Sequence, residues 1–190
     1  MTKMIHISHN GNKEILFTYA AGYYNSGMIL ADVLLDDNRY SQLSSLMEGF
    51  RIESIKLEEE YNIYPVMFLF RHYLELIIKA MYVYFDINNK KYYDMKVNLL
   101  SNHRLSEIWP GLKQKLMEEE SDYYGEDSYY FVETLDGIVK KFILIDNDSY
   151  RFRYPIDKNN DLYFKRDKEY NLEKIRNDIR EFDEIIHEFM

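Results

Sequence analysis

Four ionisable residues lie within the strongly apolar segment from Tyr64 to Ala80: Arg71, His72, Glu75 and Lys79. A segment this apolar is expected to be buried as a helix, and buried charge is costly unless it is paired. The spacing from Arg71 to Glu75 and from Glu75 to Lys79 is i,i+4, so opposite charges can pair along one helix face. A histidine can act as a general base, an arginine can stabilise a pentavalent phosphate, and a glutamate can orient either of them.

Other polar residues are expected to join this cluster when the chain folds. The candidate catalytic residues are Arg71, His72, Glu75 and His103, with Arg180 and His187 as a separate pair; the candidate binding residues are Asp148, Arg151, Arg153 and Tyr154. One interpretation is an acid–base site that cleaves RNA through its 2′-hydroxyl group. The other is a satisfied buried network of Arg71, Glu75, His103 and Arg153 that pins an irregular segment to the helices. Both predict that these residues meet, and only the first requires access to solvent.

The sequence does not indicate a metal site or a cofactor. His6 and His9 are three residues apart, but no third ligand accompanies them. The chain has no cysteine, which excludes disulfides and thiolate metal sites. No phosphate-binding glycine loop, nucleophile elbow, HExxH motif or zinc-finger spacing occurs. We therefore expect chemistry without a metal ion, or no catalysis.

The negative charge is concentrated in one part of the chain. The formal net charge is −9, and residues 118–148 carry ten acidic residues against two lysines, which gives −8. Residues 151–168 are mildly basic, with six basic and three acidic residues. This pattern lacks the broad positive face of a dedicated nucleic-acid-binding protein. RNA is thus a partner that the charge does not indicate.

Helical periodicity dominates the elements that must position these residues. Apolar side chains recur at helical spacing over residues 13–36, 42–60, 64–85 and 127–145, and Asn171 can cap a last helix. A further helix begins near residues 103–105, and Pro110-Gly111 inside its pattern predicts a kink or a break. Small residues from Ala20 to Gly27 predict a face that lets another helix approach closely. We expect an all-α bundle forming one domain over residues 1–190, with residues 1–12 as a flexible or extended arm.

The helical pattern is interrupted between residues 148 and 165 by an irregular segment rich in aromatic and basic residues. The alternation of Tyr150, Phe152 and Tyr154 predicts an extended conformation there, with Arg151 and Arg153 on the opposite side. Residues 157–160 have the composition of a turn.

Three short motifs, in order, resemble those of the HEPN-like superfamily (higher eukaryote and prokaryote nucleotide-binding). Residues 70–79, Phe-Arg-His-Tyr-Leu-Glu-Leu-Ile-Ile-Lys, resemble its "RHxLELxLK" helix. His103-Arg104-Leu105 with Ile108-Trp109 resembles its "HDLxxLW" helix start, with Arg104 in place of the usual aspartate. Residues 151–155, Arg-Phe-Arg-Tyr-Pro, are similar to the "FRYP" segment of uncharacterised bacterial members. The resemblance extends over roughly residues 15–190.

The resemblance implies a helical bundle around an up-down four-helix core, often dimeric. Many members are metal-independent endoribonucleases of toxin–antitoxin and antiphage systems, and others are non-catalytic binding or scaffold domains. The nuclease members carry Arg-x4-6-His near a helix end, and Arg180 followed by six residues and His187 matches this spacing. A chain of this composition contains about one such spacing by chance.

Two functions remain open at this point. The first is an interaction or accessory module of a bacterial or phage-conflict system, such as defence or toxin–antitoxin, which the charge and the 19 tyrosines favour. It would act through the acidic residues 118–148 or through residues 151–168. The second is a metal-independent endoribonuclease. We expect a homodimer, a possible protein partner and a cytoplasmic location, since the charged residues in the longest apolar run disfavour a membrane span.

Overall fold

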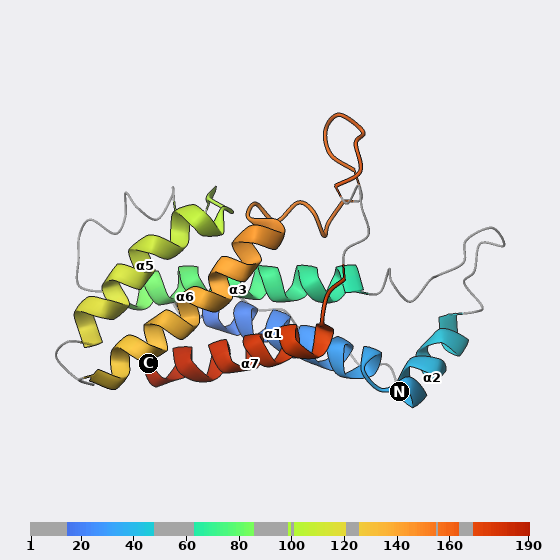
Figure 1. Ribbon diagram of the computed structural model, residues 1–190, viewed down its shortest axis with the longest axis horizontal. Helices are drawn as coiled ribbons and strands as arrows, with labels where there is room; N and C mark the ends of the chain where they lie inside the picture. The colour runs from blue at the N-terminus through green and yellow to red at the C-terminus, as the bar shows by residue number, and fades with distance from the viewer. Residues whose placement is uncertain are drawn as a thin grey trace.

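The computed structural model describes residues 15–47, 63–85, 99, 101–120, 126–154, 156–163 and 169–190. Within these ranges the chain is an all-α helical bundle (Figure 1). Its helices are α1 (Ile15–Leu34), α2 (Asp37–Met47), α3 (Ile63–Phe85), α5 (Leu105–Glu120), α6 (Glu126–Asp146) and α7 (Leu172–Glu188). The β structure in the described residues is one isolated bridge between Ile156 and Leu162. The expected arm at residues 1–12 lies outside the described residues.

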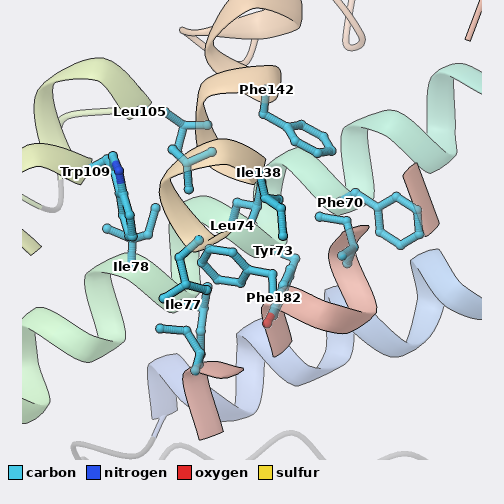
Figure 2. Close-up of a cluster of buried hydrophobic side chains, with 14 of the residues drawn as sticks. Phe70, Tyr73, Leu74, Ile77, Ile78, Leu105, Trp109, Ile138, Phe142 and Phe182 are labelled. Atoms are coloured by element: carbon cyan, nitrogen blue, oxygen red, sulfur yellow. The ribbon is translucent and has the colours of Figure 1, made fainter. Parts of the chain in front are cut away.

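Helix α3 is the central element of the bundle. It packs against α1, α5 and α6, and apolar side chains such as Phe70, Leu74 and Ile78 on it are fully buried. Figure 2 shows these side chains meeting residues of α5, α6 and α7, among them Phe142 and Phe182. Burial on this scale is the main stabilising contribution to a bundle, and it fixes α3 as the frame that positions the polar residues on its surface.

The close approach of α1 to α3 depends on small residues, as the sequence predicted, but on fewer of them. Ala20, Gly27 and Ala31 are buried, and a Cβ atom at Gly27 would lie 2.6 Å from the ring of Phe70. Gly22 is exposed, with nothing within 4 Å of the corresponding position. Only the buried half of the small-residue segment therefore faces α3.

One predicted helix boundary was wrong, and one predicted break does not occur. The helix expected over residues 42–60 begins at Asp37, because the side chain of Asp36 accepts hydrogen bonds from the backbone of Asn38 and Arg39 at 3.0 and 3.2 Å and so starts a new helix directly after α1. Residues 48–60 of that prediction lie outside the described residues. Of the kink or break predicted at Pro110-Gly111, the break does not occur, since helix α5 runs through Pro110. The carbonyl of Ser106, which proline cannot pair, belongs to an exposed residue where water can reach it.

Polar contacts hold α5 and α6 together as an antiparallel pair (Figure 1). The indole of Trp109 on α5 donates to Asp136 Oδ1 on α6 at 2.8 Å, and Lys113 and Lys140 lie 2.9 and 2.7 Å from Asp136 Oδ2. This arrangement places the first residues of α5 next to the last residues of α6, and the segment that follows α6 lies at the same end of the bundle (Figure 1). The predicted cap at Asn171 is confirmed, since its side chain accepts from Lys174 N.

Candidate functional site

The predicted charge ladder is present on α3 and is buried. Arg71, Glu75 and Lys79 are 0, 1 and 2% exposed. Arg71 Nη1 lies 3.3 Å from Glu75 Oε2, and Lys79 Nζ lies 2.7 Å from Glu75 Oε1. Burial opposes the charge of Glu75, but the hydrogen bond and charge of Lys79, with His103 and Arg71, hold its pKa below the usual value. Glu75 is therefore a buried carboxylate shared by several cationic or imidazole groups.

Arg71 acts as a structural clamp. Its Nε donates to the carbonyl of Asp146 at 2.7 Å, and its Nη2 donates to the carbonyls of Asn147 at 2.7 Å and of His103. One guanidinium thus joins the segment before α5 to the end of α6. Arg71 is fully buried, each of its three nitrogens makes a hydrogen bond, and no donor is directed to solvent, as the network interpretation predicted for this residue.

His103 combines contact with the buried network and access to solvent. Its Nδ1 lies 2.8 Å from Glu75 Oε1, and 48% of its side chain is exposed. Because the Glu75 carboxylate can only accept, Nδ1 carries the hydrogen, and Nε2 of the neutral ring is an acceptor. No other described residue bonds to Nε2. The fold thereby fixes the tautomer of an accessible imidazole.

His103 lines a pocket of about 940 Å³ between the start of α5 and the segment after α6. On the α5 side the lining includes residues 101–104 and Glu107. On the opposite side it consists of Asp148, Tyr150, Tyr154, Ile156, residues 157–159 and Tyr163. The pocket has the volume of a ligand site, and it brings together three residues that the sequence nominated, His103, Asp148 and Tyr154.

The segment that forms the second wall is folded by Asp146, which is fully buried at the end of α6. Asp146 Oδ1 accepts from the backbone of Tyr150 and Arg151 at 3.1 and 3.4 Å. Burial is the main reason that the pKa of Asp146 is raised, and these backbone hydrogen bonds act in the opposite direction. Oδ2 has no hydrogen-bond partner among the described residues. Ser149 then adopts a left-handed conformation, with φ of 65°, which turns the chain away from the helix.

The predicted extended conformation of residues 150–154 is wrong, although the segment is irregular as expected. The backbone N–H of Tyr154 donates to the carbonyl of Tyr150 at 3.1 Å, as in a single helical turn. The i,i+4 spacing places Tyr150 and Tyr154 side by side, with ring centroids 6.4 Å apart and planes at 27°. Phe152, expected on the same side as the tyrosines, is instead buried against the core.

Arg151 and Arg153 do not line the pocket. Arg151 Nη1 donates to the carbonyl of Ile145 at 2.9 Å. The guanidinium of Arg153 lies over the ring of Phe68, 5.3 Å from its centroid, and donates to Ser149 Oγ at 3.3 Å. Both predicted binding residues therefore fasten the segment to the helices.

His72 is separated from the pocket. Its ring stacks on Phe68 at 5.6 Å and meets the edge of Tyr23 at 4.4 Å. Burial lowers its pKa, and its Nδ1 has no hydrogen-bond partner among the described residues. The environment therefore favours a neutral, packed histidine.

Arg180 and His187 are both exposed on α7, but they do not converge within one chain. A step of seven residues along the helix places their Cα atoms roughly 10 Å apart along the axis. His187 Nδ1 makes a hydrogen bond to the carbonyl of Asp183 at 2.7 Å. The exposed residues between them include Glu181 and Glu184, whose charge disfavours a phosphate. A joint action of this pair would need a second copy of the chain.

Sequence reasoning missed several residues of the lining, notably Tyr163, Lys158 and Asn102. The i,i+4 spacing of Tyr150 and Tyr154 was a visible signal, but it was interpreted as strand alternation. The remaining lining residues come from separate segments that only the fold brings together.

The described residues contain no group of three or more His, Asp or Glu side chains arranged to hold a metal ion, and His6 and His9 lie outside them. Nor does this part of the chain contain a helix that combines the length and apolarity needed to cross a membrane. Comparison with protein-family models, with curated proteins and with solved structures finds no match to this chain.

Proposed function

We propose that this protein is a HEPN-like helical interaction module of a bacterial or phage-conflict system, and that its partner contacts the pocket lined by His103 and Tyr154. The ordered motifs on α3, at the start of α5 and after α6 support the assignment, as does the all-α fold. The first motif supplies the Arg71 clamp, the second supplies the accessible His103, and the third supplies Tyr154 in the second wall of the pocket that His103 lines. A recessed surface of this size suits an inserted side chain or loop of a partner.

The observation that carries this proposal is that the arginines near His103 already have partners within the protein. Cleavage of RNA without a metal needs a cation beside the imidazole to stabilise the phosphate. Arg71 is sealed and bonded to three carbonyl groups. Arg104 pairs with Glu107 at 2.9 Å, and Arg151 and Arg153 are directed to Ile145 and Phe68. The geometry therefore favours binding over phosphoryl transfer.

A second candidate is a metal-independent endoribonuclease centred on His103. It is favoured by the contact of His103 Nδ1 with Glu75, which leaves Nε2 able to accept a proton from a ribose 2′-hydroxyl. Lys158 lines the same pocket and supplies a cation. In this reaction the 2′-oxygen would bond to phosphorus, the bond to the 5′-oxygen would break, and the proton on Nε2 would pass to the leaving oxygen.

Cleavage of labelled RNA in the presence of EDTA separates the two functions. The variants are His103→Gln and the double variant Arg180→Ala/His187→Ala, with His72→Gln as the matched histidine control because His72 is packed outside the pocket. The interaction module predicts no cleavage by the folded wild type over several RNA substrates. It also predicts capture of a partner protein from a lysate of the source cells, and loss of that capture in Asp148→Asn.

Cleavage that is lost in His103→Gln and retained in His72→Gln would refute the interaction module and establish the endoribonuclease. Cleavage lost only in the double variant would place the same activity on α7. Circular dichroism on each variant shows whether the helices persist, so that a loss of activity is not mistaken for unfolding.

A further inference from the structure

Several polar groups of the pocket already have partners. Glu107 accepts from Arg104 at 2.9 Å and from Asn102 at 2.9 Å. Asp157 Oδ1 accepts from the backbone of Asn159 and Asp161 at 2.8 and 2.9 Å, which shapes the turn. These contacts stabilise the lining of the pocket. The groups that take part in them are not available to a ligand, so fewer polar groups remain for binding.

The groups that remain are acceptors, aromatic faces and one cation, Lys158. His103 offers Nε2, because Nδ1 is bonded to Glu75. Asp148 lines the pocket. No described residue forms a hydrogen bond or ion pair with it, although its charge favours the charged forms of Arg104 and Arg71. The rings of Tyr150 and Tyr154 are 42 and 53% exposed. A carboxylate, an imidazole nitrogen and two tyrosine rings form a set that matches a cation bearing N–H donors.

The charge of the pocket agrees with this set. Among the described residues, the lining carries three carboxylates, Glu107, Asp148 and Asp157, against the two cations Arg104 and Lys158. Burial, and after it the charges of Asp148, Asp157 and Asp146, raise the pKa of Tyr163, so carboxylates lie near this residue of the lining. Arg151 and Arg153, the basic residues of the wall segment nearest Tyr154, are held outside the pocket.

We propose that the pocket binds the side chain of an arginine in a basic segment of a partner protein, with Asp148 and His103 Nε2 accepting its N–H groups and the tyrosine rings contacting its planar face. This inference rests on the interaction function proposed above and names the chemistry of the partner. The overall charge of −9 brings such a segment to the molecule.

Arginine fits this set better than lysine or an anion. A guanidinium is planar, has five N–H donors and stacks on aromatic rings, so it can use the acceptors and the rings at the same time. An ammonium group lacks the flat face. A phosphate would meet an acceptor at Nε2 and the carboxylate of Asp148, and both contacts are unfavourable unless a proton is added.

Isothermal titration calorimetry with the peptide acetyl-Gly-Arg-Gly-Arg-Gly-amide, at physiological ionic strength, tests the proposal. The control peptide carries citrulline at both arginine positions, which keeps the shape and removes the charge. We expect binding of the arginine peptide, and affinity at least about tenfold weaker for the citrulline peptide. Asp148→Asn should weaken binding of the arginine peptide about tenfold or more, and Tyr154→Leu about threefold to fivefold.

Glu181→Gln on α7 is the matched variant, since it removes one exposed negative charge away from the pocket and should change the affinity less than twofold. The proposal is wrong if both peptides bind equally, if Glu181→Gln weakens binding as much as Asp148→Asn, or if the folded wild type binds neither peptide. Any of these results without RNA cleavage would overturn the arginine site alone. RNA cleavage that depends on His103 would instead overturn the interaction module.

Discussion

At the residue scale, two residues that contact the same buried carboxylate differ in their exposure to solvent. Arg71 and His103 both contact Glu75, yet Arg71 is sealed and His103 is half exposed. The difference arises because Arg71 lies in the middle of α3, whereas His103 precedes α5 at the end of the bundle. The same charge cluster therefore stabilises the fold through Arg71 and presents an oriented imidazole through His103.

Replacing Arg71 by lysine tests the clamp. Lysine keeps the charge, but one ammonium cannot reach the three carbonyl groups and Glu75 together. We expect the free energy of unfolding in urea to fall by about 3 kcal/mol, as for other changes that leave buried polar groups unpaired. Arg104→Lys, at an exposed ion pair, should leave the unfolding midpoint nearly unchanged. Equal effects of the two substitutions would contradict the clamp.

Protonation of Asp136 should account for part of the loss of stability at acid pH. Burial disfavours its charge, but hydrogen bonds from Lys140, Lys113 and Trp109 lower its pKa from 3.8 to about 2. A carboxyl whose pKa is lower in the folded state stabilises the fold above its unfolded pKa, and this stabilisation is lost as the pH falls from about 4 to about 2. The difference corresponds to about 2 kcal/mol at neutral pH.

Urea unfolding of Asp136→Asn and the wild type at pH 7 and pH 3 measures this contribution. At pH 7 the free energy of unfolding of the wild type should exceed that of Asp136→Asn by about 2 kcal/mol. This difference should be smaller at pH 3. Glu181→Gln serves as the surface control and should show no such narrowing. A gap that is constant with pH would show that Asp136 acts through shape and hydrogen bonding and not through its charge.

At the element scale, the contact between α1 and α3 is set by Gly27. A Cβ atom there would lie 2.6 Å from Phe70 Cε1 and 3.4 Å from the Cβ of Leu69, so the helices must separate or Phe70 must leave its position. Gly22, on the exposed side of the same helix, has nothing within 4 Å. The two glycines therefore form a matched pair in one helix.

We expect Gly27→Ala to lower the free energy of unfolding by about 1–3 kcal/mol through overpacking. Gly22→Ala should raise it by about 0.5–1 kcal/mol, since alanine restricts the unfolded chain and favours a helix. Thermal unfolding followed by circular dichroism gives both values. If Gly27→Ala is stabilising as well, the helices are not in the close contact described above.

At the scale of the whole molecule, stability should be graded outward from α3. This helix packs against α1, α5 and α6, and most of its residues from Val66 to Val83 are buried. Helix α2 packs on α1 at the edge of the bundle (Figure 1). Peripheral helices open locally at a lower free energy than a central one.

Hydrogen–deuterium exchange measured by mass spectrometry tests this order. Amides of α3 should exchange only on global unfolding, so that their protection follows the free energy measured in urea. Amides of residues 41–47 on α2 should exchange much faster, through local opening. Gly27→Ala should reduce protection of α3 and α1 together. Similar protection of α2 and α3 would show that α2 belongs to the same cooperative unit.

Much of the fold could be predicted from the sequence because helical periodicity and capping are local. The bounds of α1, α3 and α6 differ from the expected ones by two residues or fewer, and α7 begins directly after the predicted cap at Asn171. The pairing of Arg71, Glu75 and Lys79 follows from i,i+4 spacing. The predictions failed where a local signal was ambiguous. Tyr150, Phe152 and Tyr154 suit a strand as well as a turn, and Asp36 was taken as a helix end although it starts α2.

The sequence by itself determined the all-α class, the buried charge ladder and the segments that could carry chemistry, since each depends on residues close together along the chain. Only the tertiary structure decided which of those residues are accessible. In the folded protein Arg71 is buried, His72 packs between Phe68 and Tyr23, and His103 is exposed in the pocket. Exposure depends mainly on contacts between residues far apart in the sequence, such as His103 with Glu75 and Arg71 with Asn147, and no local pattern encodes them.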